Sequence, residues 1–197
     1  MPQFDLKGIR IAEYKLGANN AVTYENAQTI GDAIAVNMEL RFAEARLYAE
    51  GRLAEYIREI TGGTLSIAEK YIPTNAKKVL FGSREKTRSI TPEGGTATQI
   101  TGLVTGSDDS PKYVGVAAYA PDMVDTEKKY YCFHFRKAKF GLPAMSFQTK
   151  GGESIQFATP TTTGELLPDD SASHDMVEDA TVDTEAEAVA WVNAVLA

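Results

Sequence analysis

Residues 130–165 read YYCFHFRKAKFGLPAMSFQTKGGESIQFATPTTTGE, and this stretch decides the fold that we expect. Tyr131, Phe133 and Phe135 alternate with other residues, which is the period of a half-buried strand with these three side chains facing the core. Further along, Gly151-Gly152 supplies the positive φ angles of a tight hairpin turn, and the alternation resumes after it. The stretch therefore predicts successive antiparallel strands.

A change of parity inside this stretch predicts a β-bulge. After Lys137 the apolar residues shift to Ala138 and Phe140. One extra residue in a strand turns every later side chain to the other face of the sheet. We therefore place a bulge near Arg136-Lys137.

Earlier segments also favour strands. Ile9 and Ile11 indicate a first strand, and residues 112–120 form a more continuously apolar one. Residues 33–43 alternate most clearly, with one face made for a core (Ile34, Val36, Met38, Leu40, Phe42) and one polar face (Asn37, Glu39, Arg41).

Residues 52–60 are ambiguous, because their apolar spacing fits a helix. The turn signal Glu50-Gly51 precedes them, and Gly62-Gly63 followed by 64–67 looks like the far side of a hairpin. This context favours a strand over 52–60.

Two helices and one long loop complete the prediction. A short helix covers 74–81, with Thr74 as its N-cap and Gly82 at its C′ position, and a second helix covers 184–197 with Asp183 or Thr184 as its cap. Residues 83–111 are rich in Ser, Thr, Gly and Asp, which predicts a long mobile loop with at most a weak hairpin near Gly94-Gly95.

The charge is unevenly distributed. The chain has 27 acidic and 20 basic residues, a net charge of −7, yet residues 160–197 contain no Lys or Arg. This acidity argues against a module that grips nucleic acid phosphates. No basic segment followed by an apolar one begins the chain and no apolar run is long enough for a bilayer, so we expect a soluble protein made in the cytoplasm.

The residues that carry enzyme chemistry are sparse. Cys132 is the only cysteine, and the two histidines, His134 and His174, are far apart in sequence. We expect His134 to be a structural strand residue, and Asp108-Asp109 and Asp169-Asp170 to be solvated turns. The glycine pairs lack phosphate-binding context. The sequence predicts no catalytic, cofactor-binding or metal-binding residues, and no cofactor.

A set of motifs in sequence order resembles a known family. The set comprises LYAEG at 47–51, TGGTL at 61–65, LFG at 80–82, TKGGESIQF at 149–157, TPT at 159–161 and DTEAEAVAWVN at 183–193. Together these motifs resemble the major tail proteins of long-tailed, non-contractile phages and prophages of Gram-positive bacteria. The resemblance covers nearly the whole chain, with 83–111 the least similar part.

The resemblance implies a mainly-β fold, a β-sandwich or half-barrel of tail-tube type with a short flanking helix and a C-terminal helix. It implies a β-domain over 1–160, an acidic linker over 161–183 and the helix over 184–197. Members form hexameric rings that stack into the tail tube of the virion, after assembly in the host cytoplasm. DNA passes through the lumen without specific binding, and the tape-measure and tail-terminator proteins are further partners.

Within that family, we expect the loop 83–111 to be an inter-ring arm, and the polar face of 33–43 (Asn37, Glu39, Arg41) to line the lumen. Two other readings stay open. One is a β-sandwich adhesin or carbohydrate-binding module of a phage, which would show an exposed aromatic platform. The other is an enzyme with a carboxylate pair assembled in space.

Overall fold

The computed structural model describes residues 5–124, 127–144 and 159–197. Within these ranges most residues lie in strands, which confirms the mainly-β class. The elements are β1 (Lys7–Leu16), the 3₁₀ turn η1 (Ala18–Asn20), β2 (Val22–Thr29), β3 (Ala33–Ala49), β4 (Arg52–Glu69), α1 (Thr74–Phe81), β5 (Arg84–Ile90), β6 (Thr98–Val104), β7 (Tyr113–Val124), β8 (Glu127–Phe140), β9 (Thr161–Leu166), β10 (Val177–Val182) and α2 (Glu185–Val195).

Eight strands form one antiparallel sheet. Seven of them follow the order β2-β1-β7-β8-β9-β4-β3, and β10 pairs with the first part of β8. The last residues of β8 pair instead with β9, so β8 connects two parts of the sheet. A separate two-stranded sheet consists of β5 and β6.

The main core lies on one face of this sheet. It joins buried residues of β1 and β7 to those of β4 and β9, which are distant in the strand order, and α1 contributes Ala76, Val79, Leu80 and Phe81. Since strands from both parts of the sheet contact one core, the sheet curves around it. About 0.8 kcal/mol per buried methylene stabilises this arrangement.

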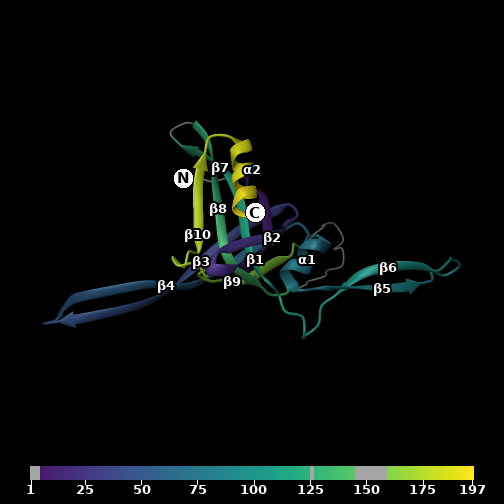
Figure 1. Ribbon diagram of the computed structural model, residues 1–197, viewed down its shortest axis with the longest axis horizontal. Coiled ribbons are helices and arrows are strands. Elements are labelled where there is room, and N and C mark those ends of the chain that lie inside the picture. Colours follow the sequence, from purple (N-terminus) through teal and green to yellow (C-terminus); the bar gives the residue numbers. More distant parts are fainter. Residues whose placement is uncertain (1–4, 125–126, 145–158) are drawn as a thin grey trace, which may run out of the picture.

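A second, smaller core lies on the opposite face. There α2 places Ala188, Val192 and Leu196 against Ala12 of β1, Ala117 of β7 and Cys132 of β8. Figure 1 shows α2 beside β7 and β8. β7 and β8 are thus covered on both faces.

The predicted bulge in β8 is confirmed. Its pairing with β7 shifts register between Val114 and Val116, where Arg136 and Lys137 lie opposite the single residue Gly115. The bulge adds local twist and bends the strand, at the point where β8 changes partner from β10 to β9.

The expected orientation of the β8 aromatics is right for two residues of three. Phe135 is buried in the main core and the half-buried Phe133 packs against it, whereas Tyr131, also half-buried, does not belong to that core. Cys132 and His134, on the opposite face, are fully buried. The prediction assumed that one face of β8 meets solvent, whereas α2 and β2 cover it.

Both predicted helices are present. Gly82 ends α1 in the left-handed conformation, with φ of 67°, as expected. The expected cap Thr74 is wrong: Pro73 occupies the N-cap position and no side chain caps α1. Thr184 caps α2, in a reciprocal capping box with Glu187.

Three segment predictions are wrong in detail. Residues 83–111 are not a long mobile loop, because β5 and β6 pair through seven consecutive positions; the hairpin expected near Gly94-Gly95 is present, with its turn between Ile90 and Thr98. Residues 161–183 are not a linker, since β9 and β10 belong to the main sheet. Gly62-Gly63 does not mark a new hairpin: β4 continues through both residues, with a register shift beside them. Gly151-Gly152 and the motif 149–157 lie outside the described residues.

The strands expected at Ile9 and Ile11, over 52–60 and over 112–120 are confirmed, whereas β2 was not anticipated. Among the described residues, no helix is both long and apolar enough to cross a membrane.

Candidate assembly surface

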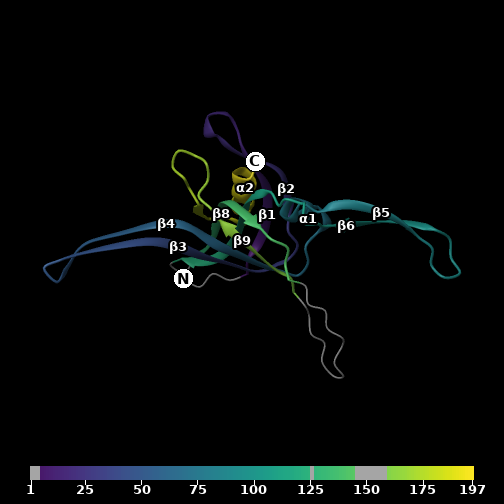
Figure 2. The same cartoon turned by 90° about the horizontal axis from the view of Figure 1, so that it is seen from below.

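Two hairpins extend from the body in opposite directions. One is the distal part of β3 and β4, residues 42–60, which we call the β3–β4 arm; the other is residues 84–104, the β5–β6 arm. Figures 1 and 2 show both arms clear of the body in two perpendicular views. Each arm is a two-stranded ribbon, and an isolated ribbon of this kind is only marginally stable in water.

The geometry of the β3–β4 arm follows from its sequence. Glu50 and Gly51 both have positive φ, 52° and 73°, which is the geometry of a tight hairpin turn. Gly62, at φ of 150°, lies beside the register shift between Arg41 and Phe42, where the arm leaves the body. A glycine tolerates this backbone geometry where other residues would be strained.

One face of the β3–β4 arm, the aromatic face, is held by cross-strand contacts. It comprises Phe42, Glu44, Arg46, Tyr56, Arg58 and Ile60. The Arg58 guanidinium lies 3.6 Å from the centre of the Phe42 ring, and that of Arg46 lies 5.4 Å from the Tyr56 ring. Glu44 forms ion pairs of 3.3 Å with both arginines. The arm is therefore ordered by its own side chains.

The other face, the aliphatic face, has no such contacts. It comprises Ala43, Ala45, Leu47, Glu55, Ile57 and Glu59. Leu47 is 59% exposed and Ile57 is 49% exposed, although both are large apolar side chains. Contiguous exposed apolar residues typically mark an interaction surface.

The predicted core face of residues 33–43 is thus only partly correct. Val36 and Leu40 pack against the main core, but Ile34, Met38 and Phe42 are exposed. Ile34 and Met38 are exposed although they lie within the body, because β3 is the edge strand of the sheet, whereas Phe42 lies where the strand extends beyond the body.

Open strand edges accompany both arms. Within the described part of the chain, the side of β4 away from β3 is paired only through Gly63–Ala68, with β9. In the described ranges, β3 is the last strand of the main sheet, and β5 and β6 pair only with each other. Unpaired N–H and C=O groups along such edges can accept a further strand.

The residues expected to be structural are held inside the fold. His134 is buried with neither ring nitrogen hydrogen-bonded. Burial, with a further contribution from Arg136, lowers the pKa of His134 to about 3, so the imidazole is neutral. Burial likewise raises the pKa of the Cys132 thiol to about 11. Neither group is placed to act as a base or nucleophile at neutral pH.

The acidic pairs are not all solvated turns, contrary to expectation. Asp169 is buried and accepts a 2.7 Å hydrogen bond from Arg136 Nε. Burial alone would raise the pKa of Asp169, but hydrogen bonds from Ser171 and Arg136 outweigh it and lower that pKa. Asp170 binds Lys137, and Asp109 binds Arg84 at 2.7 Å. These carboxylates therefore anchor loops to the body.

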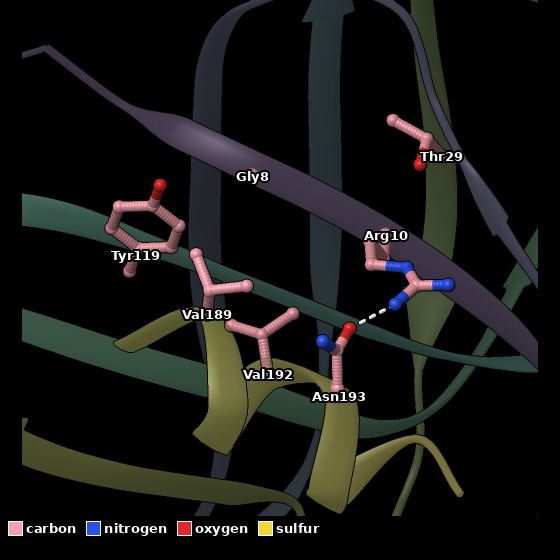
Figure 3. A pocket seen from close by; sticks show the side chains of 7 residues that line it. All are labelled: Gly8, Arg10, Thr29, Tyr119, Val189, Val192 and Asn193. Carbon is pink, nitrogen blue, oxygen red and sulfur yellow. Dashed lines mark hydrogen bonds between the residues drawn. The ribbon is translucent and has the colours of Figure 1, made fainter. Parts of the chain in front are cut away.

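One shallow pocket, of about 220 Å³, lies between β1 and α2. Figure 3 shows Arg10 and Asn193 hydrogen-bonded at one side of it, with Val189 and Val192 of α2 nearby. No carboxylate, imidazole or thiol lines it. Among the described residues, no three metal-ligating side chains gather into a possible metal site.

No protein-family model matches the chain, and no curated protein matches it significantly.

Sequence reasoning missed the two arms as a pair. The signal for the β3–β4 arm was weak, because the alternation of residues 33–43 ends where the arm begins and the apolar spacing of 52–60 also fits a helix, whereas the strands themselves, of 17 and 18 residues, are longer than strands usually are. The alternating cations Arg84, Lys86 and Arg88 were the corresponding signal in the β5–β6 arm.

Proposed function

We propose that this chain is a structural subunit that assembles with its own copies into rings, and that the rings stack into a tube of the phage tail type. The observation that carries the proposal is the β3–β4 arm, which exposes large apolar residues and unpaired strand edges outside the body.

The energetics of the arm support an assembling protein. Fully burying a side chain such as Leu47 or Ile57 is worth about 1.5–3 kcal/mol. A monomer gains only part of this, because both side chains are about half exposed. A head-to-tail contact made through an arm closes into a ring if its rotation permits, and otherwise grows into a filament.

The charge pattern supports a conduit that does not hold DNA. The net charge is −7. The face of β3, β4 and β9 away from the core carries Asn37, Glu39, Ser66 and Thr163, and its one arginine there, Arg41, is paired with Glu165. Such a surface offers few free cations to phosphates, which would otherwise slow passage.

An adhesin remains the second candidate, and one observation favours it. Tyr48 and Tyr56 are exposed on the β3–β4 arm, at 62% and 44%. Exposed aromatic rings on one ribbon resemble the platform on which a sugar ring stacks. A monomer that bound glycans, and lost this binding with Tyr56→Ala, would favour the adhesin.

Sedimentation velocity over a wide concentration range tests the proposal. The wild-type chain should sediment as a monomer at low concentration and as large assemblies at high concentration. A variant in which Asn-Gly replaces residues 44–58 keeps the body and removes most of the arm, and it should remain monomeric. Equal assembly by this variant would show that the β3–β4 arm is not the joint.

A further inference from the structure

We infer that the free edge of β4 in the β3–β4 arm pairs with the free edge of β5 in a second copy, antiparallel, with Glu55 opposite Arg88. This inference rests on the proposed function and names the contact that builds the assembly. The partner is a second copy of this chain, because the two strand edges are complementary in charge.

Both edges are available. Within the described residues, Arg52–Gly62 of β4 has a partner only on the β3 side, and β5 has one only on the β6 side. The arms extend from opposite sides of the body (Figure 1), so one copy can present β4 to the β5 of the next. Such a contact is head-to-tail and can propagate.

The charges match in this register. Glu55 lies opposite Arg88, and Glu59 lies opposite Arg84, on one face of the joined sheet. On the other face Arg58 lies opposite Glu85. Three opposite-charge pairs form and no like charges meet, and each directly opposed pair contributes roughly 0.2–1 kcal/mol.

The apolar surfaces also match. Ile57 lies opposite Lys86, whose aliphatic stem can cover it, in the regular part of β4 that begins at Glu55. Ile57 is 49% exposed in the single chain. Joining the arms converts two marginal ribbons into a four-stranded sheet, which passes the size at which sheets become stable on their own.

The central pair is free to form. Among the described residues neither Glu55 nor Arg88 has an ion-pair partner within the chain. Arg58, Arg84 and Glu85 have partners already, in Glu44, Asp109 and Lys78. The pair Glu55–Arg88 therefore gives the cleanest test.

Pairing of β4 with the β4 of a second copy is the competing arrangement. It would place Glu55 opposite Arg58 twice, about a two-fold axis. That contact closes as a dimer and involves no residue of β5.

Charge reversal separates these arrangements. Glu55→Arg and Arg88→Glu should each raise the concentration at half-assembly about tenfold or more, which corresponds to about 1.4 kcal/mol. The double variant Glu55→Arg/Arg88→Glu should return the concentration at half-assembly to within about threefold of the wild-type value. Lys128→Glu, an exposed reversal on β8, is the matched control and should have no effect. Unchanged urea midpoints of the monomers would show that all variants fold.

Disulfide trapping gives an independent readout. Tyr56→Cys in one copy lies opposite Thr87→Cys in another, within the regular part of β4, and the natural Cys132 is buried. A mixture of the two variants should form a disulfide-linked dimer under mild oxidation, while either variant alone should not.

The outcomes are distinct. Wild-type protein that never assembles overturns both the proposed function and this contact. Wild-type protein that assembles while Arg88→Glu assembles equally well, or a double variant that stays as impaired as the single ones, overturns only the β4–β5 contact.

Discussion

The guanidinium of Arg58 lies directly over the ring of Phe42, 3.6 Å from its centre, in a part of the chain that contacts no core. A cation over an aromatic ring contributes about 0.5–1 kcal/mol at an exposed site. Together with the ion pairs of Glu44, this contact orders the β3–β4 arm before any partner is present. An ordered arm pays less entropy on binding than a disordered one.

The aliphatic face of the arm should matter for assembly and not for folding. We predict that the double variant Leu47→Ser/Ile57→Ser keeps the unfolding free energy of the monomer within about 0.5 kcal/mol, because both side chains are exposed. The same variant should stay monomeric at concentrations where wild type assembles. Val189→Ser, an equally exposed change on α2, is the control and should assemble normally. Loss of assembly in both variants would count against a specific role of the arm.

The close approach of β9 to β8 requires a glycine at 164. A Cβ there would lie 2.6 Å from the Phe140 ring and 2.7 Å from the Lys139 carbonyl oxygen. Since Phe140 is fully buried, we predict that Gly164→Ala destabilises the monomer by about 2–4 kcal/mol in urea unfolding. Gly102→Ala in β6, where nothing lies within 4 Å, should change stability by less than about 0.5 kcal/mol. Equal effects would contradict the described packing.

Glu69 should make stability depend on pH. Its carboxylate is fully buried without a hydrogen bond, and burial raises the pKa of Glu69 from 4.5 to about 7. Because the folded-state pKa is the higher one, the folded protein is favoured below pH 4.5 and this stabilisation is lost as pH rises to about 7. Glu69→Gln should remove this dependence of the unfolding free energy on pH. It should also stabilise the protein at pH 8 by about 2–4 kcal/mol. Urea unfolding at pH 5 and pH 8, with Glu55→Gln as the exposed control, measures both effects.

His134 should not titrate in the physiological range while the protein is folded. Burial lowers the pKa of His134 to about 3, whereas a histidine in an unfolded chain titrates near 6.5. The contribution of neutral His134 to the free energy of unfolding is therefore fully present above pH 6.5 and is lost as pH falls toward 3. The NMR chemical shifts of the His134 imidazole should stay constant between pH 5 and 8 in the folded protein. In urea-unfolded protein the same chemical shifts should change with pH over this range. A midpoint near 6.5 in the folded state would mean that the imidazole is accessible.

The local structure was largely predictable from sequence. The alternation around Phe135 and the parity change at Lys137 predicted both the strand β8 and its bulge, because these depend on neighbouring residues. Gly82 predicted the end of α1 for the same reason. In contrast, nothing local shows that α2 covers Cys132 or that Tyr24 of β2 packs on His134, so the second core could not be anticipated.

The candidate surface was the least predictable part. Exposure of Phe42 and Ile57 depends on where the body ends, and an alternating strand looks the same over a core and beyond it. The Ser- and Thr-rich composition of 83–111 suggested a loop, but Thr is a good strand former and β5 and β6 pair residue by residue. The polar composition of this segment reflected two exposed faces of a ribbon.

Electron microscopy of concentrated, purified wild-type protein would show whether the chain assembles with its own copies. We expect rings and tubes of uniform diameter, in which averaged density places the β3–β4 arm of each subunit against a neighbouring copy. A population of single particles of monomer size at every concentration would contradict this expectation.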